Sequence, residues 1–260
     1  MTISTGSTQL PPRQQRHSRP PGVILGTSLA MVSAAALAFA GSAEAAATSV
    51  DLGTAKSMAV LGGSGVTNTG PSVLNGDLGS FPNPSMTGFG TAPNGTVNGS
   101  IYAADAVSSQ AQADLTAAYD NAAGQGIPTT HATELGGSTL VPGVYNSSSG
   151  TFGITGALTL DAKGDPDAAF VFQTQTTLIS AAASRVRLIN GAQACNVFWK
   201  VGSSATLGTS SVFTGNILAL QSISLNNGVT VDGRLLARNG AVTLINDTVS
   251  PAGCATGGGT

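Results

Sequence analysis

Three aspartates in one short segment come closest, by residue type and spacing, to a chemical site. Asp161, Asp165 and Asp167 lie in the sequence DAKGDPD. Grouped carboxylates can bind calcium, or act as acid and base in a polysaccharide-cleaving enzyme, when they converge in a groove. The glycine and proline between them favour a turn in which the aspartates hydrogen-bond to the backbone. We therefore predict a turn here, not a calcium or catalytic loop.

The other chemistry-bearing residues are isolated. His131 is the one histidine after residue 45, and it lies in a connection rich in threonine and glycine. A single histidine without partners supplies neither a metal site nor a nucleophile–base pair. The segment GGSG (residues 62–65) lacks the lysine and hydroxyl residue of a phosphate-binding loop, so we expect a corner of the chain there. We predict no enzyme, no metal site and no other cofactor.

The two cysteines, Cys195 and Cys254, are 59 residues apart. In an extracellular protein an isolated pair of this kind usually forms a disulfide bond. The bond would restrict the unfolded chain by about 4 kcal/mol in the loop-entropy picture. A reactive or metal-binding thiol is the alternative, but no histidine lies near either cysteine in the sequence. We predict a bridge that ties the C-terminal tail to the body.

Residues 1–45 have the three parts of an export signal. Four basic residues lie between positions 13 and 19, residues 23–40 are almost wholly apolar, and Ala43-Glu44-Ala45 places small residues where signal peptidase reads them. We predict a signal peptide cleaved after Ala45 and a secreted, extracellular protein. An uncleaved membrane anchor is the alternative; the apolar segment is short and rich in alanine, glycine and serine, which disfavours it.

Residues 46–260 carry few charges. Seven lysines and arginines stand against eleven aspartates and glutamates, a net charge of −4. No basic stripe is available for nucleic acid, and the many valines, leucines, isoleucines and phenylalanines distinguish the chain from a disordered one. We expect a single domain, monomeric and without a membrane attachment once the signal is removed.

One five-residue pattern recurs four times: apolar, polar, glycine, polar, apolar. The copies are LNGDL (residues 74–78), VNGSI (97–101), FTGNI (213–217) and VDGRL (231–235). Alternation with a period of two is typical of a strand with one solvated face. The last two copies are eighteen residues apart, and the same offset relates other apolar positions, such as Leu207 and Leu225. The repeat therefore covers several strands.

Three families of short strands follow from that offset. The first contains FVFQ (170–173), VFWK (197–200), ILAL (217–220) and LLAR (235–238); the second contains TTLI (176–179), SATL (204–207), SISL (222–225) and AVTL (241–244). The third contains the glycine-centred pattern and ends with DTVS (247–250). A β-sandwich predicts strand spacing but not a register kept across three families. The sequence thus predicts a mostly β protein, a three-sided β-solenoid.

One segment, residues 101–123, breaks the strand pattern. Val107, Ala111, Leu115, Ala118 and Ala122 recur at helical spacing. We predict an α-helix with Ser100 as N-cap and Gly124 just beyond its end. Its apolar stripe consists of small residues, so the helix should pack closely along one side of the solenoid. A membrane-surface or partner-binding helix is the alternative, and the lack of basic residues on its polar face disfavours it.

The assembled pattern resembles the ice-binding-protein-like family of secreted bacterial and fungal proteins. The resemblance lies in AVLGGSGVTNTGPSVLNGDLGSFP (59–82), in the helical segment YAADAVSSQAQADLTAAYDNAAG (102–124) and in LNNGVTVDGRLLARNGAVTLIN (225–246), and it extends over nearly all of residues 46–260. It implies a discontinuous right-handed β-solenoid with one long flanking helix. It also implies adsorption to ice, with inhibition of ice growth or recrystallisation.

Ice binders of the family use a flat face bearing a loose motif of Thr, a small residue, any residue, then Thr or Asn. The matching stretches are TSSV (209–212), which departs at its end, and NGVT (227–230), which departs at its start. If Phe213 and Val231 point inward, alternation directs their neighbours outward in two columns. The first column contains Val212, Thr230 and Thr248, and the second contains Thr214, Asp232 and Ser250. The ice-contact candidates are Thr209, Ser211, Val212, Thr214, Asn227, Thr230, Thr248 and Ser250.

Charged residues near this face leave an alternative open. Arg185, Arg187, Asp232 and Arg234 lie in or beside the third strand family. Charge is strongly hydrated and disturbs an ordered water layer, whereas it suits recognition of a glycan or protein. The alternative is therefore an extracellular structural or adhesive module that binds cell-wall glycan or protein and has no affinity for ice.

Overall fold

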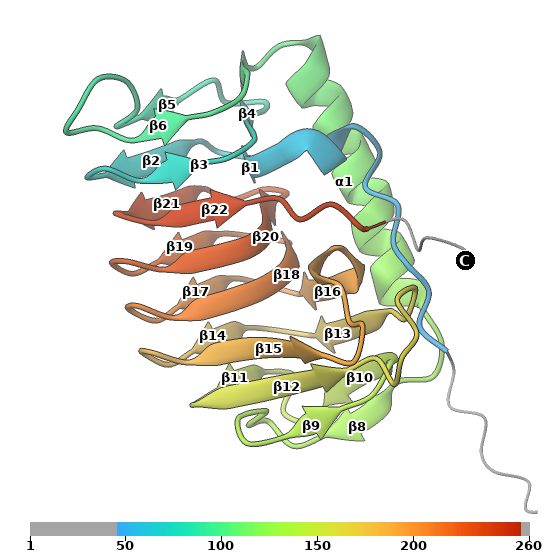
Figure 1. Ribbon diagram of the computed structural model, residues 1–260. Helices are drawn as coiled ribbons and strands as arrows, with labels where there is room; N and C mark the ends of the chain where they lie inside the picture. The colour runs from blue at the N-terminus through green and yellow to red at the C-terminus, as the bar shows by residue number, and fades with distance from the viewer. Residues whose placement is uncertain (1–45, 256–260) are drawn as a thin grey trace, which may run out of the picture. The chain divides into compact units, whose positions relative to one another are not determined.

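The computed structural model describes residues 46–255 as a stack of parallel β coils with one long helix alongside (Figure 1). Each complete coil contributes a strand to each of three faces. The first face contains β7 (Ile101–Ala103), β4 (Asp77–Ser80), β1 (Met58–Gly62), the second halves of β20 (Thr230–Ala237) and β18 (Val212–Ala219), β16 (Val197–Val201), β13 (Phe170–Thr174), β10 (Gly143–Ser147) and β8 (Thr129–His131).

The second face is a separate seven-stranded sheet. Its strands, in spatial order, are β5 (Met86–Thr87), β2 (Val66–Thr69), β21 (Val242–Ile245), β19 (Ile223–Leu225), β17 (Ala205–Leu207), β14 (Leu178–Ser180) and β11 (Phe152–Ile154). The third face contains β6 (Thr96–Val97), β3 (Val73–Leu74), β22 (Thr248–Ser250), the first halves of β20 and β18, β15 (Arg185–Ile189), β12 (Ala157–Asp161) and β9 (Thr139–Leu140).

The predicted register is confirmed. Leu207 pairs with Leu225 on the second face, and on β18 and β20 Phe213 pairs with Val231 and Ile217 with Leu235. Like positions therefore stack in columns from coil to coil, as expected of a solenoid. Their apolar side chains fill the interior, where the ring centroids of Phe172 and Trp199 are stacked 4.0 Å apart.

The central glycine of the repeated pattern lets the chain turn from the third face into the first. Gly215 and Gly233 have φ values of 112° and 152° and pair with each other, so β18 and β20 run around this corner as unbroken strands of eight residues. A Cβ on Gly233 would lie 2.0 Å from the carbonyl oxygen of Gly215. The glycine is therefore fixed by both its φ and its crowding.

The order of coils in space differs from their order in the chain. β1 pairs with β20 on one side and β4 on the other, and β2 and β3 likewise stack on β21 and β22. The N-terminal coils thus continue the stack beyond the last C-terminal coil. The helix α1 (Ala106–Gly124) follows β7 and precedes β8, so it connects the two ends of the stack.

The helix is present, but its predicted start is wrong. Ile101 and Tyr102 pair with Leu78 and Gly79 of β4, so the first predicted helical residues form a strand. The N-cap is Asp105, not Ser100: its side chain accepts a hydrogen bond from Ser108 N, and Ser108 Oγ accepts one from Asp105 N, which makes a capping box. Gly124, predicted to lie beyond the end, is the last helical residue.

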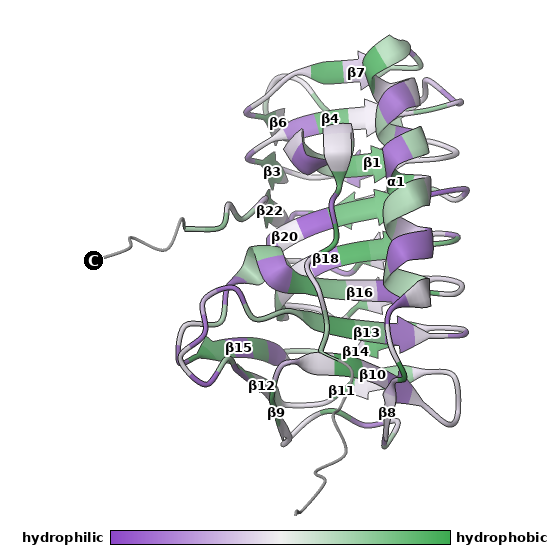
Figure 2. Ribbon diagram, turned by 90° about the vertical axis from the view of Figure 1, so that its right-hand side faces the viewer, coloured by the Kyte–Doolittle hydropathy of each residue, from purple (hydrophilic) through white to green (hydrophobic). Residues whose placement is uncertain are grey.

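The small apolar stripe of the helix packs on the first face, as predicted. Ala111, Leu115, Ala118 and Ala122 are buried against apolar residues of the first face, so these strands are covered on both sides (Figure 2). None of the helices in residues 46–255 is long and apolar enough to cross a membrane. The predicted signal peptide and its cleavage site lie outside the described residues.

The predicted disulfide is confirmed. Cys195, in the short 3-10 helix η2 (Ala194–Asn196), is bonded to Cys254, and their Cα atoms are 5.4 Å apart. The bond ties the segment after β22 to the start of β16, and β20 and β18 lie between these two strands in the stack.

Candidate functional site

The second face presents one continuous outward column in which most residues bear a hydroxyl group. On each strand the residues on either side of the outward position are largely buried, which is the alternation expected of a sheet with one solvated side. Strand pairing places the outward residues in register across all seven strands. In spatial order the column is Gly153, Ile179, Thr206, Ser224, Thr243, Thr67 and Thr87.

This face carries no charge. The seven strands contain no Asp, Glu, Lys, Arg or His. Two carboxylates lie at its borders. Glu134 forms a bridge with Gly153 of β11 and accepts a hydrogen bond from Thr155 Oγ1 at 3.0 Å, and Asp247 accepts one from Ile245 N at the corner with the third face. The column is therefore a neutral ladder of hydroxyl and methyl groups, with a repeat of about 4.8 Å from strand to strand.

The second face also rests on a rigid support. Leu207, Leu225 and Leu244 point inward beside the column and are at most 1% exposed. Each packs in the single large core that fills the solenoid. Because such interiors are close-packed, the outward hydroxyl groups are held at fixed spacing.

The third face contains the first predicted column. Val212, Thr230 and Thr248 pair in register, and Val212 is 42% exposed. The same column continues to Val73 on one side and to Arg185 on the other. Arg185 is exposed, so this column is interrupted by a charge.

The prediction that Thr214 points outward in the second column is wrong. Thr214 is 6% exposed, and its Oγ1 donates to the carbonyl oxygen of Val186 at 3.2 Å. β15 pairs with β18 only at Arg185, and beyond that residue the Thr214 side chain takes over the contact between the two strands. Asp232 is exposed and Ser250 half-buried in the same register.

The remaining predicted ice contacts lie at the corner between the second and third faces, not on a strand. Thr209 and Asn227 are exposed there. Ser211 is 1% exposed and accepts a hydrogen bond from Ser180 Oγ at 3.4 Å, so it is unavailable to a surface ligand. The prediction that Ser211 contacts ice is therefore contradicted by its burial.

Asp247 holds this corner together. Its Oδ1 accepts a hydrogen bond from Val229 N and its Oδ2 one from Ile245 N, each at 2.7 Å. Burial raises the pKa of the Asp247 carboxyl to about 6, and the N–H donors around it oppose that rise. Its own N–H donates to Ser72 Oγ in the next coil, so the residue links the last C-terminal coil to the N-terminal ones.

The three aspartates singled out by their spacing form turns. Asp161 pairs with Lys163 Nζ at 2.7 Å, and hydrogen bonds from Lys163 and Asn190 lower the pKa of its carboxyl to about 2. Asp165 Oδ1 accepts a hydrogen bond from Asp167 N at 2.9 Å, as in an Asx turn. Within residues 46–255, no three His, Cys, Asp or Glu side chains form a group that could hold a metal ion.

A sequence model described as ice-binding-like matches residues 60–250. The chain belongs to the ice-binding-like family. A relative named ice-binding protein, from Nostoc sp. (strain HG1), is 53% identical over 213 residues, which cover 80% of this chain and 77% of the relative. Another, from Flavobacterium frigoris (strain PS1), is 35% identical and covers 77% and 76%.

Solved structures of similar proteins have the same fold. An ice-binding protein from an Antarctic biological consortium superposes with a TM-score of 0.76 at 42% identity, over 80% of this chain and 93% of the other. The ice-binding protein of the Antarctic ascomycete Antarctomyces psychrotrophicus gives 0.75 at 43% identity, over 79% and 100%. The β-solenoid with one flanking helix is therefore the fold that this chain shares with these members of the ice-binding-like family.

Sequence reasoning missed the column on the second face. Its signal was present in the second strand family, where Thr206, Ser224 and Thr243 occupy one position of the aligned repeats. Thr67 and Thr87 could not be joined to them from the repeat alone, because the N-terminal coils stack on the C-terminal end.

Proposed function

We propose that this protein binds ice crystals and that the second face is the surface in contact with ice. The observation that carries the proposal is the neutral column from Thr206 to Thr87, in which each of five consecutive strands contributes one outward hydroxyl group. A rigid ladder of hydroxyl and methyl groups can hold water in a regular layer, and a charge would disturb that layer. The two relatives described above are named ice-binding proteins, and their names support the same function.

The third face is the competing surface for the same function. Val212, Thr230 and Thr248 form a shorter column there, but Arg185 stands in that column and Asp232 in the next. We favour the second face because it has no charged residue in its strands. The exposed candidates Thr209 and Asn227 lie at the border between the two faces and remain predictions.

Ice recrystallisation in the presence of purified protein tests both parts of the proposal. Thr243→Tyr places a bulky ring in the middle of the second face, and Thr230→Tyr is the matched change on the third. We expect the wild type and Thr230→Tyr to inhibit recrystallisation and Thr243→Tyr to lose most of the effect. Circular dichroism should show that both variants are folded, since both side chains point outward.

Two results would overturn the proposal in different ways. Undiminished crystal growth at high wild-type concentration would reject ice binding. Loss of inhibition in Thr230→Tyr with full inhibition in Thr243→Tyr would move the site to the third face.

We also infer that the protein is exported and that it acts by binding, not by catalysis. The disulfide supports an oxidising compartment. N-terminal sequencing of protein recovered outside the cells should begin at Ala46. Recovery of the intact N-terminus in the membrane fraction would instead favour the anchor.

A further inference from the structure

Among residues 46–255, one coil of the stack is not formed by a continuous strand at the glycine corner. β18 and β20 pass this corner as continuous strands, but in the next coil the corner is formed by two segments far apart in the sequence, and we call this place the break. β22 arrives there and leaves as the tail that begins at Pro251, while η1 (Gly53–Ser57) enters and becomes β1. Val60 of β1 pairs with Leu235, the residue after Arg234, so the interrupted corner lies directly on the intact corner of β20.

Arg234 bridges the two ends of this break. Its Nε donates to the carbonyl oxygen of Lys56, on the entering segment, at 2.8 Å, and its Nη1 donates to that of Ala252, on the leaving segment, at 3.2 Å. Nη1 also donates at 2.9 Å to Asn216 Oδ1, in the coil below. One guanidinium thereby contacts three segments that the chain does not connect at this point.

Burial makes these contacts strong. Arg234 is 4% exposed, and no carboxylate among residues 46–255 lies within ion-pair distance of it. A buried cation must be solvated by fixed acceptors, and here those acceptors are the backbone on both sides of the break. The planar fork of arginine can reach several acceptors in fixed directions, which an ammonium group cannot.

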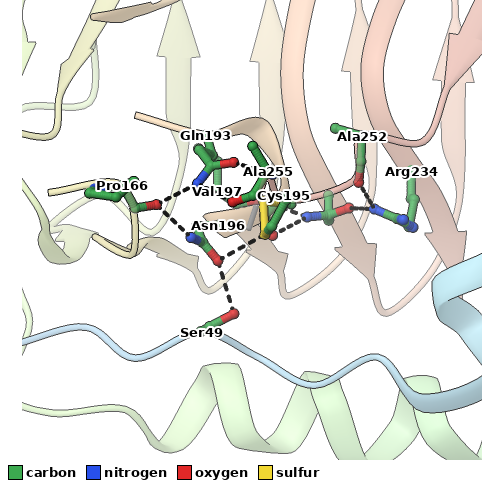
Figure 3. Close-up of a disulfide and its surroundings, with 11 residues drawn as sticks. Ser49, Pro166, Gln193, Cys195, Asn196, Val197, Arg234, Ala252 and Ala255 are labelled. Atoms are coloured by element: carbon green, nitrogen blue, oxygen red, sulfur yellow. Dashed lines mark hydrogen bonds between the residues drawn. A yellow bond between two sulfur atoms is a disulfide. The ribbon is translucent and has the colours of Figure 1, made fainter. Parts of the chain in front are cut away.

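The leaving segment is fastened beyond Ala252 (Figure 3). Cys254 is bonded to Cys195, and Ala255 N donates to Gln193 Oε1 at 2.6 Å. Asn216 Nδ2 donates to the carbonyl oxygen of Cys195 at 3.2 Å, which connects the same anchor to Arg234. The carbonyl oxygen of Ala252 is therefore held in place by Arg234 on one side and by the disulfide bond on the other.

We propose that Arg234 is a positioning residue that acts as a splint: it holds the entering and leaving segments together at the break. In this way it keeps the two parts of the second face in register. Thr67 and Thr87 belong to the N-terminal coils, whereas Thr206, Ser224 and Thr243 belong to the C-terminal coils. The column crosses the joint between Thr243 and Thr67, where the coils are not joined by the chain. This inference rests on the proposed function of the second face.

Hydrogen exchange of the purified protein tests the splint without reference to ice. In Arg234→Met we expect amides of β1, β2, β3, β21 and β22 to exchange about tenfold faster or more, with β13 and β14 unchanged. The matched control is Arg238→Met, because Arg238 contacts Tyr119 and Asp120 of α1 and not the break. Equal exchange at the joint in the two variants would reject the splint.

Two further variants keep the test decisive if Arg234→Met fails to fold. Arg234→Lys keeps the charge and the stem but cannot reach all three acceptors, so it should loosen the same amides to a smaller extent. Cys254→Ser releases the tail while Arg234 stays, and it should act at the same joint. Protection in both variants equal to that of the wild type would overturn the proposal.

Ice recrystallisation near the freezing point then tests the effect on the face. We expect Arg238→Met to keep its inhibition and a folded Arg234→Met to lose most of it. Full inhibition by a folded Arg234→Met would reject the positioning role. A wild type without any effect on ice would reject the proposed function alone, because hydrogen exchange still decides whether Arg234 splints the break.

Discussion

The second and third faces are built by the same coils yet differ in what they expose. Both alternate buried apolar residues with outward ones, and both keep register across the joint between the chain halves. The second face exposes a neutral column, whereas the third places Arg185 and Asp232 in its columns and buries Thr214. The scaffold therefore fixes the spacing of outward groups, and only their chemistry distinguishes a surface suited to ordered water.

The largest expected effect concerns the acid between the two faces. Both oxygens of Asp247 accept backbone N–H groups, so Asp247→Asn would direct an amide N–H₂ at a backbone donor. We expect the free energy of unfolding to fall by about 1–3 kcal/mol. Asp232→Asn, on the exposed third face, is the control and should change it by less than about 0.5 kcal/mol. Urea unfolding measures both, and equal losses would contradict the distinction.

A smaller effect is the pH dependence that Asp247 confers. Because burial raises its pKa from 3.8 to about 6, the folded protein binds this proton more tightly than the unfolded chain does. The contribution to stability is therefore present below pH 4 and is lost as the pH rises through 6. Asp161 has the opposite sign: its pKa is lowered to about 2, so its contribution is lost as the pH falls below 4.

Urea midpoints between pH 4 and 6.5 measure the first of these dependences. The wild type should lose stability over that window relative to Asp247→Asn, which lacks the titrating group. The same slope in both proteins would show that Asp247 does not titrate there.

The smallest expected effect tests whether a neutral column suffices for ice binding. Arg185→Thr combined with Asp232→Thr removes the charge from the column of Val212 and from the next column, while Arg187 stays exposed on β15. We expect recrystallisation inhibition to stay within about twofold of the wild type, because Thr214 stays buried against Val186 and offers no hydroxyl group on the third face. A large gain in inhibition would show that charge alone had kept that face from ice.

Most of the fold could be predicted from the residues. The eighteen-residue offset gives the pairs of β18 with β20 and of β17 with β19, since stacked coils require the same apolar residues at the same positions. The predicted helix start was wrong because Ile101–Ala103 forms a strand that is stabilised by pairing with β4. β4 lies well before this segment in the sequence, so the local pattern does not show the contact. Local propensity does not report such pairing.

The sequence by itself determined the strand families, the glycine corner and the apolar stripe of the helix, because each depends on residue type at a fixed local spacing. It also determined the disulfide pair, because the sequence contains two cysteines. Only the tertiary structure decided which outward residues form one surface. Thr67 pairs with Thr243 although the chain does not connect their coils, and Thr214 is buried with its hydroxyl group hydrogen-bonded to Val186. The physical reason is that a column requires neighbours in space, and in a discontinuous solenoid the neighbour of the last coil is the first.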